Sequence, residues 1–145
     1  MSNFPENRHL KNDTKNFQTL DGLRILIVDD DTDSLVLTRF LLETYGVDIM
    51  TATSALEALE VIKQFIPDVL IIDIAMPEVD GYSLIRRIRT LEPPQKEIPA
   101  IALTAIDSEE GCVLAFKCGF QSYLMKPADP DELATQITHL LTKNH

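Results

Sequence analysis

Polar side chains suited to chemistry stand directly after four apolar segments of the chain. They are Asp29 and Asp30 after residues 25–28, Asp73 after 69–72, Thr104 after 98–103, and Lys126 after 123–125. Two carboxylates about 4 Å apart repel each other by about 4 kcal/mol at an effective dielectric near 20, so acids held together need a compensating positive charge. Mg²⁺ usually binds one or two protein carboxylates, several waters and a phosphate oxygen. An ammonium and a hydroxyl are the groups that an arriving phosphoryl would need.

The pattern of apolar residues predicts five strands that alternate with five helices. We expect strands at 25–28, 47–52, 69–72, 98–103 and 123–125. We expect helices near 33–45, from 54 to before Pro67, from after Asp80 to about 89, near 108–118, and from Pro130 onward. Strands that are apolar throughout, separated by amphipathic helices, are typical of a parallel sheet covered on both faces. The sequence therefore predicts an α/β fold with five βα units, a doubly wound parallel sheet and right-handed crossovers.

Helical spacing also predicts which side chains are buried and which are solvated. The apolar stripes are Val36, Leu37, Phe40 and Leu41; Leu56, Leu59 and Ile62; Leu84, Ile85 and Ile88; and Leu133, Ile137, Leu140 and Leu141. Arg86, Arg87 and Arg89 are expected to form a solvated helix face. Asp31 and Asp33 are interpreted as turn or cap residues.

Composition and charge restrict the classes of function. The chain has 145 residues, with 23 acidic side chains against 13 Lys plus Arg and a formal net charge of −10. Such a charge disfavours nucleic acids and anionic membranes as primary partners. No apolar run approaches the roughly 18 residues of a membrane span, and residues 1–21 have no signal-peptide core. We expect a flexible polar extension at 1–21, one folded domain at 22–145 and a cytoplasmic location.

The two cysteines are not expected to pair with each other. Cys112 and Cys118 fall in one predicted helix, about 9 Å apart along its axis. That separation exceeds the normal disulfide reach of about 7 Å between Cα atoms. Their interpretation as small, mostly buried apolar residues gives no reason to expect an oxidising compartment.

The polar residues that follow the strands should gather at one edge of the sheet. In an open α/β sheet, ligands bind beyond the carboxyl ends of the strands, where the strand order reverses. Three carboxylates, one hydroxyl and one ammonium would meet there.

Four motifs together resemble the receiver domain of two-component response regulators. They are "ILIVDDD", "VLIIDIAMPEVDG", "IPAIALTA" and "YLMKP", in order and each closing a predicted strand. The resemblance covers about residues 23–141, and we expect residues 22–145 to form a receiver domain with no output domain after it. It also implies the flavodoxin-like strand order 2-1-3-4-5.

The resemblance assigns roles by position. It implies that Asp73 is the phosphoacceptor, a nucleophile toward a phosphohistidine. Asp30 would bind Mg²⁺ directly beside Asp73, Asp29 would act through water, and the backbone carbonyl of Ala75 would complete the protein ligands. Lys126 would pair with the phosphoryl group. Mn²⁺ is the alternative metal.

The resemblance further implies a switch. Thr104 would hydrogen-bond the phosphoryl group and move toward it, letting Tyr123 swing inward and altering the surface of the fourth helix, fifth strand and fifth helix. The Lys126–Pro127 bond is expected to be cis. The implied partners are a sensor histidine kinase or a histidine phosphotransfer protein, and a downstream protein target. A homodimer is left open.

Other classes of function either fit these residues less well or stay open. An EF-hand calcium loop starting at Asp29 would need Gly and Glu where Ser34 and Phe40 stand. A flavin phosphate would be repelled by the acids after the first strand. The dehalogenase-like phosphohydrolases usually have an Asp where Ala75 stands, so an enzyme acting on outside phosphoesters is not expected. A receiver that docks without switching, and a relay that passes the phosphoryl group to another histidine, stay open.

Overall fold

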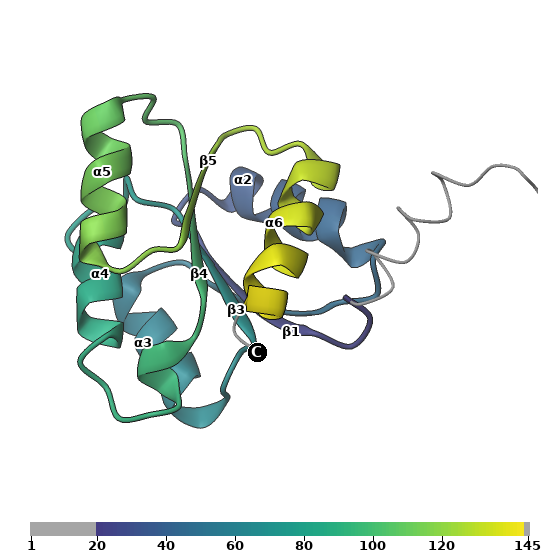
Figure 1. Cartoon of the computed structure of the whole chain (residues 1–145), viewed down its shortest axis with the longest axis horizontal. Helices are drawn as coiled ribbons and strands as arrows, with labels where there is room; N and C mark the ends of the chain where they lie inside the picture. Colours follow the sequence, from purple (N-terminus) through teal and green to yellow (C-terminus); the bar gives the residue numbers. More distant parts are fainter. Residues whose placement is uncertain (1–19, 144–145) are drawn as a thin grey trace, which may run out of the picture.

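The computed structural model of the chain describes residues 20–143 (Figure 1). Its strands are β1 (Arg24–Val28), β2 (Asp48–Ala52), β3 (Val69–Ile72), β4 (Ala100–Thr104) and β5 (Ser122–Met125). Its helices are α2 (Thr32–Glu43), α3 (Ala55–Gln64), α4 (Gly81–Ile88), α5 (Glu109–Cys118) and α6 (Pro130–Lys143), with a 3-10 helix, η1 (Gln95–Glu97), before β4. The five expected strands and five expected helices are all present, with small differences at their ends. The extension expected at 1–21 lies almost wholly outside the described residues.

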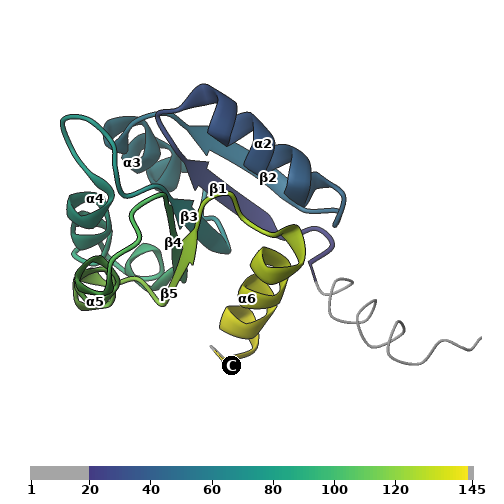
Figure 2. The ribbon, with the colours of Figure 1, turned by 90° about the horizontal axis from the view of Figure 1, so that it is seen from above.

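All strand pairs in the sheet are parallel, and the order is β2-β1-β3-β4-β5. This confirms the predicted doubly wound α/β fold and its 2-1-3-4-5 order. The views in Figures 1 and 2 place α2 and α6 on one side of the sheet and α3, α4 and α5 on the other. A sheet covered on both faces explains why the three inner strands, β1, β3 and β4, are almost entirely apolar.

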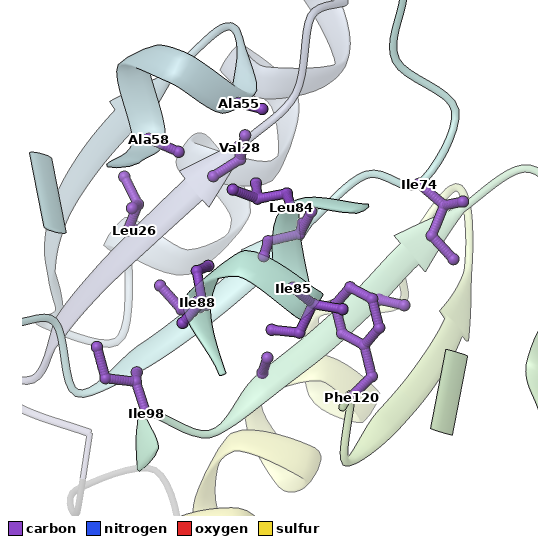
Figure 3. Packing of buried hydrophobic residues seen from close by; sticks show 14 of the residues in the cluster. Leu26, Val28, Ala55, Ala58, Ile74, Leu84, Ile85, Ile88, Ile98 and Phe120 are labelled. Atoms are coloured by element: carbon purple, nitrogen blue, oxygen red, sulfur yellow. The ribbon is translucent and has the colours of Figure 1, made fainter. Parts of the chain in front are cut away.

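Each face of the sheet has its own hydrophobic core. Successive side chains of a strand point to opposite faces, and β1 shows this directly. Leu26 and Val28 belong to the core under α3, α4 and α5, whereas Ile25 and Ile27 belong to the core under α2 and α6. Figure 3 shows the first core, where α3 contributes small side chains such as Ala58 and α4 contributes larger ones.

The predicted buried faces are correct for α4 and α6, partly correct for α3 and wrong for α2. The stripes of α4 and α6 do pack into the cores. The buried residues of α2 are instead Leu35, Thr38 and Leu42. In α3 the predicted Ile62 is buried and Leu59 packs against the core, together with the unpredicted Ala55 and Ala58. Val36, Leu37, Phe40 and Leu56 are exposed. Helical spacing identifies an apolar stripe, but it does not distinguish a stripe that packs on the sheet from one that faces outward.

Side-chain caps fix where the helices begin. Asp31 accepts hydrogen bonds from two backbone N–H groups at the start of α2, as the cap interpretation predicted. Ser54 accepts from the N–H of Glu57 at 3.1 Å, which is one of the two hydrogen bonds of a capping box. The second bond of a capping box would run from the N–H of Ser54 to the Glu57 carboxylate. Here that carboxylate accepts instead from the N–H of Thr53, at 2.7 Å.

The expectation that Arg86, Arg87 and Arg89 form one solvated face is wrong for Arg89. Arg86 and Arg87 are exposed, but Arg89 is half-buried just after the helix. Its guanidinium donates five hydrogen bonds, to the carbonyls of residues 96, 98 and 119 and to the side chain of Gln121. Burial lowers the pKa of Arg89. The side chain therefore joins α4 to the start of β4 and to the α5–β5 turn.

Two smaller expectations concern the cysteines and the membrane. Both cysteines are free, with Cys118 buried and Cys112 half-buried. Among the described residues, no helix combines the length and apolar character needed to cross a bilayer.

Candidate phosphoacceptor site

The carboxyl ends of four strands bring the expected site residues to one edge of the sheet. Asp29 and Asp73 follow strand residues that pair with each other in the register of β1 and β3. Thr104, the last residue of β4, accepts a backbone hydrogen bond from Lys126 at 2.9 Å. The apolar strands thus set the spacing of the polar residues that follow them.

Three carboxylates form a cluster at this edge. Oxygen atoms of Asp29, Asp30 and Asp73 all lie within 4.8 Å of one another. Asp29 is 3% exposed and Asp73 is 6% exposed, whereas Asp30 faces solvent. The backbone N–H of Asp31 donates to Asp29 at 3.0 Å and so orients its carboxylate. At this separation the acids repel one another strongly unless a positive charge lies among them.

Lys126 supplies part of that charge. Its ammonium donates to Asp29 Oδ2 at 2.7 Å and lies 3.5 Å from Asp73 Oδ2. Burial lowers the pKa of Lys126, but the hydrogen bond to Asp29 and the charge of Asp73 outweigh burial, so the net shift is upward. The lysine therefore stays charged at neutral pH. One ammonium among three ionised carboxylates still leaves an excess of negative charge.

Asp73 is the carboxylate whose ionisation is most disturbed. Burial raises its pKa to about 6, with the charge of Asp29 acting in the same direction and that of Lys126 opposing it. The backbone N–H of Ala75 also favours the ionised form, donating to Asp73 Oδ1 at 3.3 Å. Above pH 6 this carboxylate is ionised, as a nucleophile must be.

Thr104 and Tyr123 are both linked to the backbone of Ile106. The Thr104 hydroxyl is fully buried and accepts from the N–H of Ile106 at 3.2 Å. No acceptor for its own proton occurs among the described residues, so a ligand oxygen could take that bond. The half-buried Tyr123 donates its hydroxyl to the Ile106 carbonyl at 2.6 Å. Sequence reasoning missed this link, because a backbone group carries no sequence signal.

Ala75 and Pro127 complete the neighbourhood. Ala75 lies two residues after Asp73, and its carbonyl accepts no hydrogen bond from the part of the chain that the structure describes. The Lys126–Pro127 bond is cis, as the resemblance implied.

The donor set fits a hard divalent cation. Mg²⁺ prefers oxygen ligands and keeps several waters. The cluster offers three carboxylates from two adjoining strand ends, and Asp30 has no hydrogen bond or ion pair with any described residue. A cation there would offset the negative charge that Lys126 leaves.

A doubly wound parallel sheet with a lysine-paired acidic cluster at its carboxyl edge defines a class of flavodoxin-like signalling domain. The family model of the response regulator receiver domain matches residues 25–138. The chain therefore belongs to the response regulator receiver family of two-component signalling. Receiver domains of this family interact with histidine kinases and downstream effectors, and they generally bind Mg²⁺.

Similar proteins extend the comparison. An uncharacterised 14.6 kDa protein of Leptolyngbya boryana is 48% identical over 116 residues, covering 80% of this chain and 88% of that protein. Response regulator SaeR of Staphylococcus aureus is 35% identical over 82% of this chain. The matched part makes up only 50% of the length of SaeR. Among solved structures, a CheY-like receiver domain protein from Methanospirillum hungatei has a TM-score of 0.76 at 32% identity, covering 85% of this chain and 96% of that one.

Proposed function

We propose that the chain accepts a phosphoryl group on Asp73 from a phosphohistidine and passes the signal on by changing a docking surface. The observation that supports this most is the Asp29–Asp30–Asp73 cluster with Lys126 bonded across two of its members. The donor would be a sensor histidine kinase or a histidine phosphotransfer protein. The chain would be a phosphoacceptor that assists its own modification, rather than an enzyme with an outside substrate.

The transfer itself needs only groups that meet at this edge. An ionised Asp73 oxygen attacks phosphorus, a P–O bond forms, and the P–N bond breaks with its electron pair returning to the imidazole nitrogen. Lys126 is close enough to Asp73 to pair with the new phosphoryl oxygens. The unused proton of the Thr104 hydroxyl is available to another of those oxygens.

Asp30, Asp73 and the Ala75 carbonyl would hold Mg²⁺, with Asp29 acting through water; Mn²⁺ is the alternative. When bound, the ion neutralises charge on the transferring phosphoryl group. The residues of this chain do the rest: the Asp31 N–H orients Asp29, and burial keeps bulk water from Asp73.

The switch would operate through Ile106. If Thr104 turns its hydroxyl toward a phosphoryl group, its bond to the Ile106 N–H is lost or weakened. The Ile106 carbonyl is the acceptor for Tyr123, so a shift of this segment frees the tyrosine to move inward. The surface of α5, β5 and α6 would change, and a downstream protein or a second copy of the chain would dock there.

This chain offers the donor protein an apolar surface beside the site. The outer side of α2 presents Val36, Leu37 and Phe40 to solvent. A cavity of about 340 Å³ lies between α2 and the segment after β5, lined by Leu37, Lys126 and Ala128 among others. A helix that carries a phosphohistidine to Asp73 would cover this surface and bury its apolar side chains.

A small phosphodonor tests the proposal without any partner. The chain is incubated with acetyl phosphate and Mg²⁺, and its intact mass is measured. A gain of one phosphoryl group is expected in wild type and in Asp33→Asn, an exposed acid of the same segment, but not in Asp73→Asn. No gain in wild type with acetyl phosphate or phosphoramidate would overturn the proposal and favour a receiver that docks without switching.

A further inference from the structure

The first turn of α5 is contacted by tyrosines from two different elements. The Tyr82 hydroxyl, from α4, donates to the Gly111 carbonyl at 3.2 Å. A Cβ atom on Gly111 would lie 3.2 Å from the hydroxyl oxygens of both Tyr82 and Tyr123, and 2.8 Å from Ser108 Oγ. Only a glycine lets all three groups approach the helix so closely. Both tyrosine hydroxyls are therefore packed on one residue of α5.

Backbone contacts of the residue before Tyr82 connect this tyrosine to the segment that follows Asp73. The preceding residue, Gly81, donates its N–H to the Ile74 carbonyl at 2.9 Å. A Cβ atom on Gly81 would lie 2.7 Å from the Asp73 carbonyl oxygen, so the first turn of α4 lies directly against the segment that follows Asp73. A displacement of that segment has to be accommodated by the start of α4.

The structure assigns Tyr82 as a second positioning residue of the switch: it ties the first turn of α5 to the phosphoacceptor segment through α4. Its effect on phosphoryl signalling rests on the proposed function, whereas the tether itself does not. Tyr123 reaches the same turn from β5, so α5 is connected to the site by two routes. One passes through Thr104, Ile106 and Tyr123, and the other through Gly81 and Tyr82.

The hydroxyl, rather than the ring, is the group to remove. The ring of Tyr82 is half-buried and packs against the core under α4 and α5, so Tyr82→Phe keeps that packing and deletes only the bond. Burial raises the pKa of Tyr82, which keeps its hydroxyl protonated and able to donate at neutral pH. Tyr45→Phe is the matched control, since its hydroxyl donates to Asp131 at 2.9 Å, between α2 and α6.

Amide hydrogen exchange measured by NMR reports the opening of this turn. In wild type the N–H of Cys112 is bonded to the Ser108 carbonyl at 3.1 Å. Loss of one neutral hydrogen bond should speed the exchange of the Cys112 and Val113 amides about threefold to tenfold in unphosphorylated Tyr82→Phe. Amides of β3 and β4 should keep their wild-type rates, and Tyr45→Phe should not affect α5. Unchanged α5 rates, or an equal rise in every element, would overturn the tether.

A second arm tests the coupling. Acetyl phosphate and Mg²⁺ are added to wild type and Tyr82→Phe, and the extent of phosphorylation is checked by mass. At equal phosphorylation, the phosphoryl-dependent change at the Cys112 and Val113 amides should be smaller in Tyr82→Phe. An equal change in both chains would overturn the coupling. Failure of wild type to become phosphorylated would refute the proposed function instead, leaving the first arm as a test of the tether.

Discussion

At the scale of single residues, the ionisation of Asp73 governs what the acidic cluster can bind. Burial raises its pKa to about 6, above the value of about 3.9 of a free Asp side chain. A raised carboxyl pKa means that the protonated form is the one favoured by folding. The stabilisation from this group is therefore complete below about pH 4 and is lost as the pH rises through 6.

The same shift predicts a pH dependence for metal binding. A bound cation requires the ionised carboxylate, so protons compete with Mg²⁺ below the pKa of Asp73. We expect the apparent affinity for Mg²⁺, measured by calorimetric titration, to fall roughly tenfold between pH 7 and pH 5. Asp33→Asn should behave like wild type, because that acid lies outside the cluster. An affinity that does not change over this range would contradict the role of Asp73 as a ligand.

At the scale of elements, the strands were predictable and one buried side chain was not. Four of the strands contain an apolar run that is followed by a polar site residue, so the meeting of Asp29, Asp73, Thr104 and Lys126 could be inferred from the sequence. Arg89 gave no such signal. Its acceptors are almost all backbone carbonyls, up to 30 residues away in the chain. Only the folded chain shows that an arginine between Ile88 and Thr90 is a half-buried connection.

Arg89 should contribute strongly to stability. Arg89→Met keeps much of the apolar stem but removes five hydrogen bonds, including those to the part-buried carbonyls of residues 98 and 119. We expect a loss of about 2–4 kcal/mol in the free energy of unfolding, measured by urea denaturation. Arg89→Lys should recover little of it, since an ammonium cannot reproduce the planar fork. Exposed Arg87→Met is the control, and a similar loss there would show that the effect is not specific to the buried connections.

The outward apolar stripe of α2 was the other failure at this scale. Val36, Leu37 and Phe40 have the spacing of a buried face, yet Phe40 is 65% exposed. The α2 side chains that do pack on the sheet are Leu35, Thr38 and Leu42. One of them is a threonine, whose hydroxyl donates back to the Ser34 carbonyl at 3.0 Å. Spacing alone favoured the longer stripe. Exposed apolar stripes occur on surfaces that other proteins cover, which agrees with the donor-docking surface proposed for α2.

At the scale of the whole molecule, the apolar surfaces lie on opposite sides of the sheet. The helices α2 and α5 lie on opposite sides of the sheet (Figure 2). Leu37 is exposed on α2, and Val113, Leu114 and Phe116 are exposed on α5. The acidic cluster sits at the edge between them. This arrangement would let one protein deliver a phosphoryl group over α2 while another reads the state of α5, without the two competing for the same residues.

That separation predicts different effects for two matched substitutions, one on α2 and one on α5. Leu37 is 47% exposed and lines the cavity beside Lys126, whereas Leu114 is 38% exposed on α5. Leu37→Ser should lower kcat/KM for transfer from a phosphorylated histidine kinase that is active on wild type by about tenfold, as for an apolar anchor in an interface. Labelling by acetyl phosphate should be unchanged, because that donor does not touch α2. Leu114→Ser should leave both rates at wild-type values, since α5 lies across the sheet from the incoming donor. If Leu37→Ser slowed both donors equally, the leucine would act on the site itself and not on the docking of the partner, and the division of the molecule into a receiving side and a reading side would be wrong.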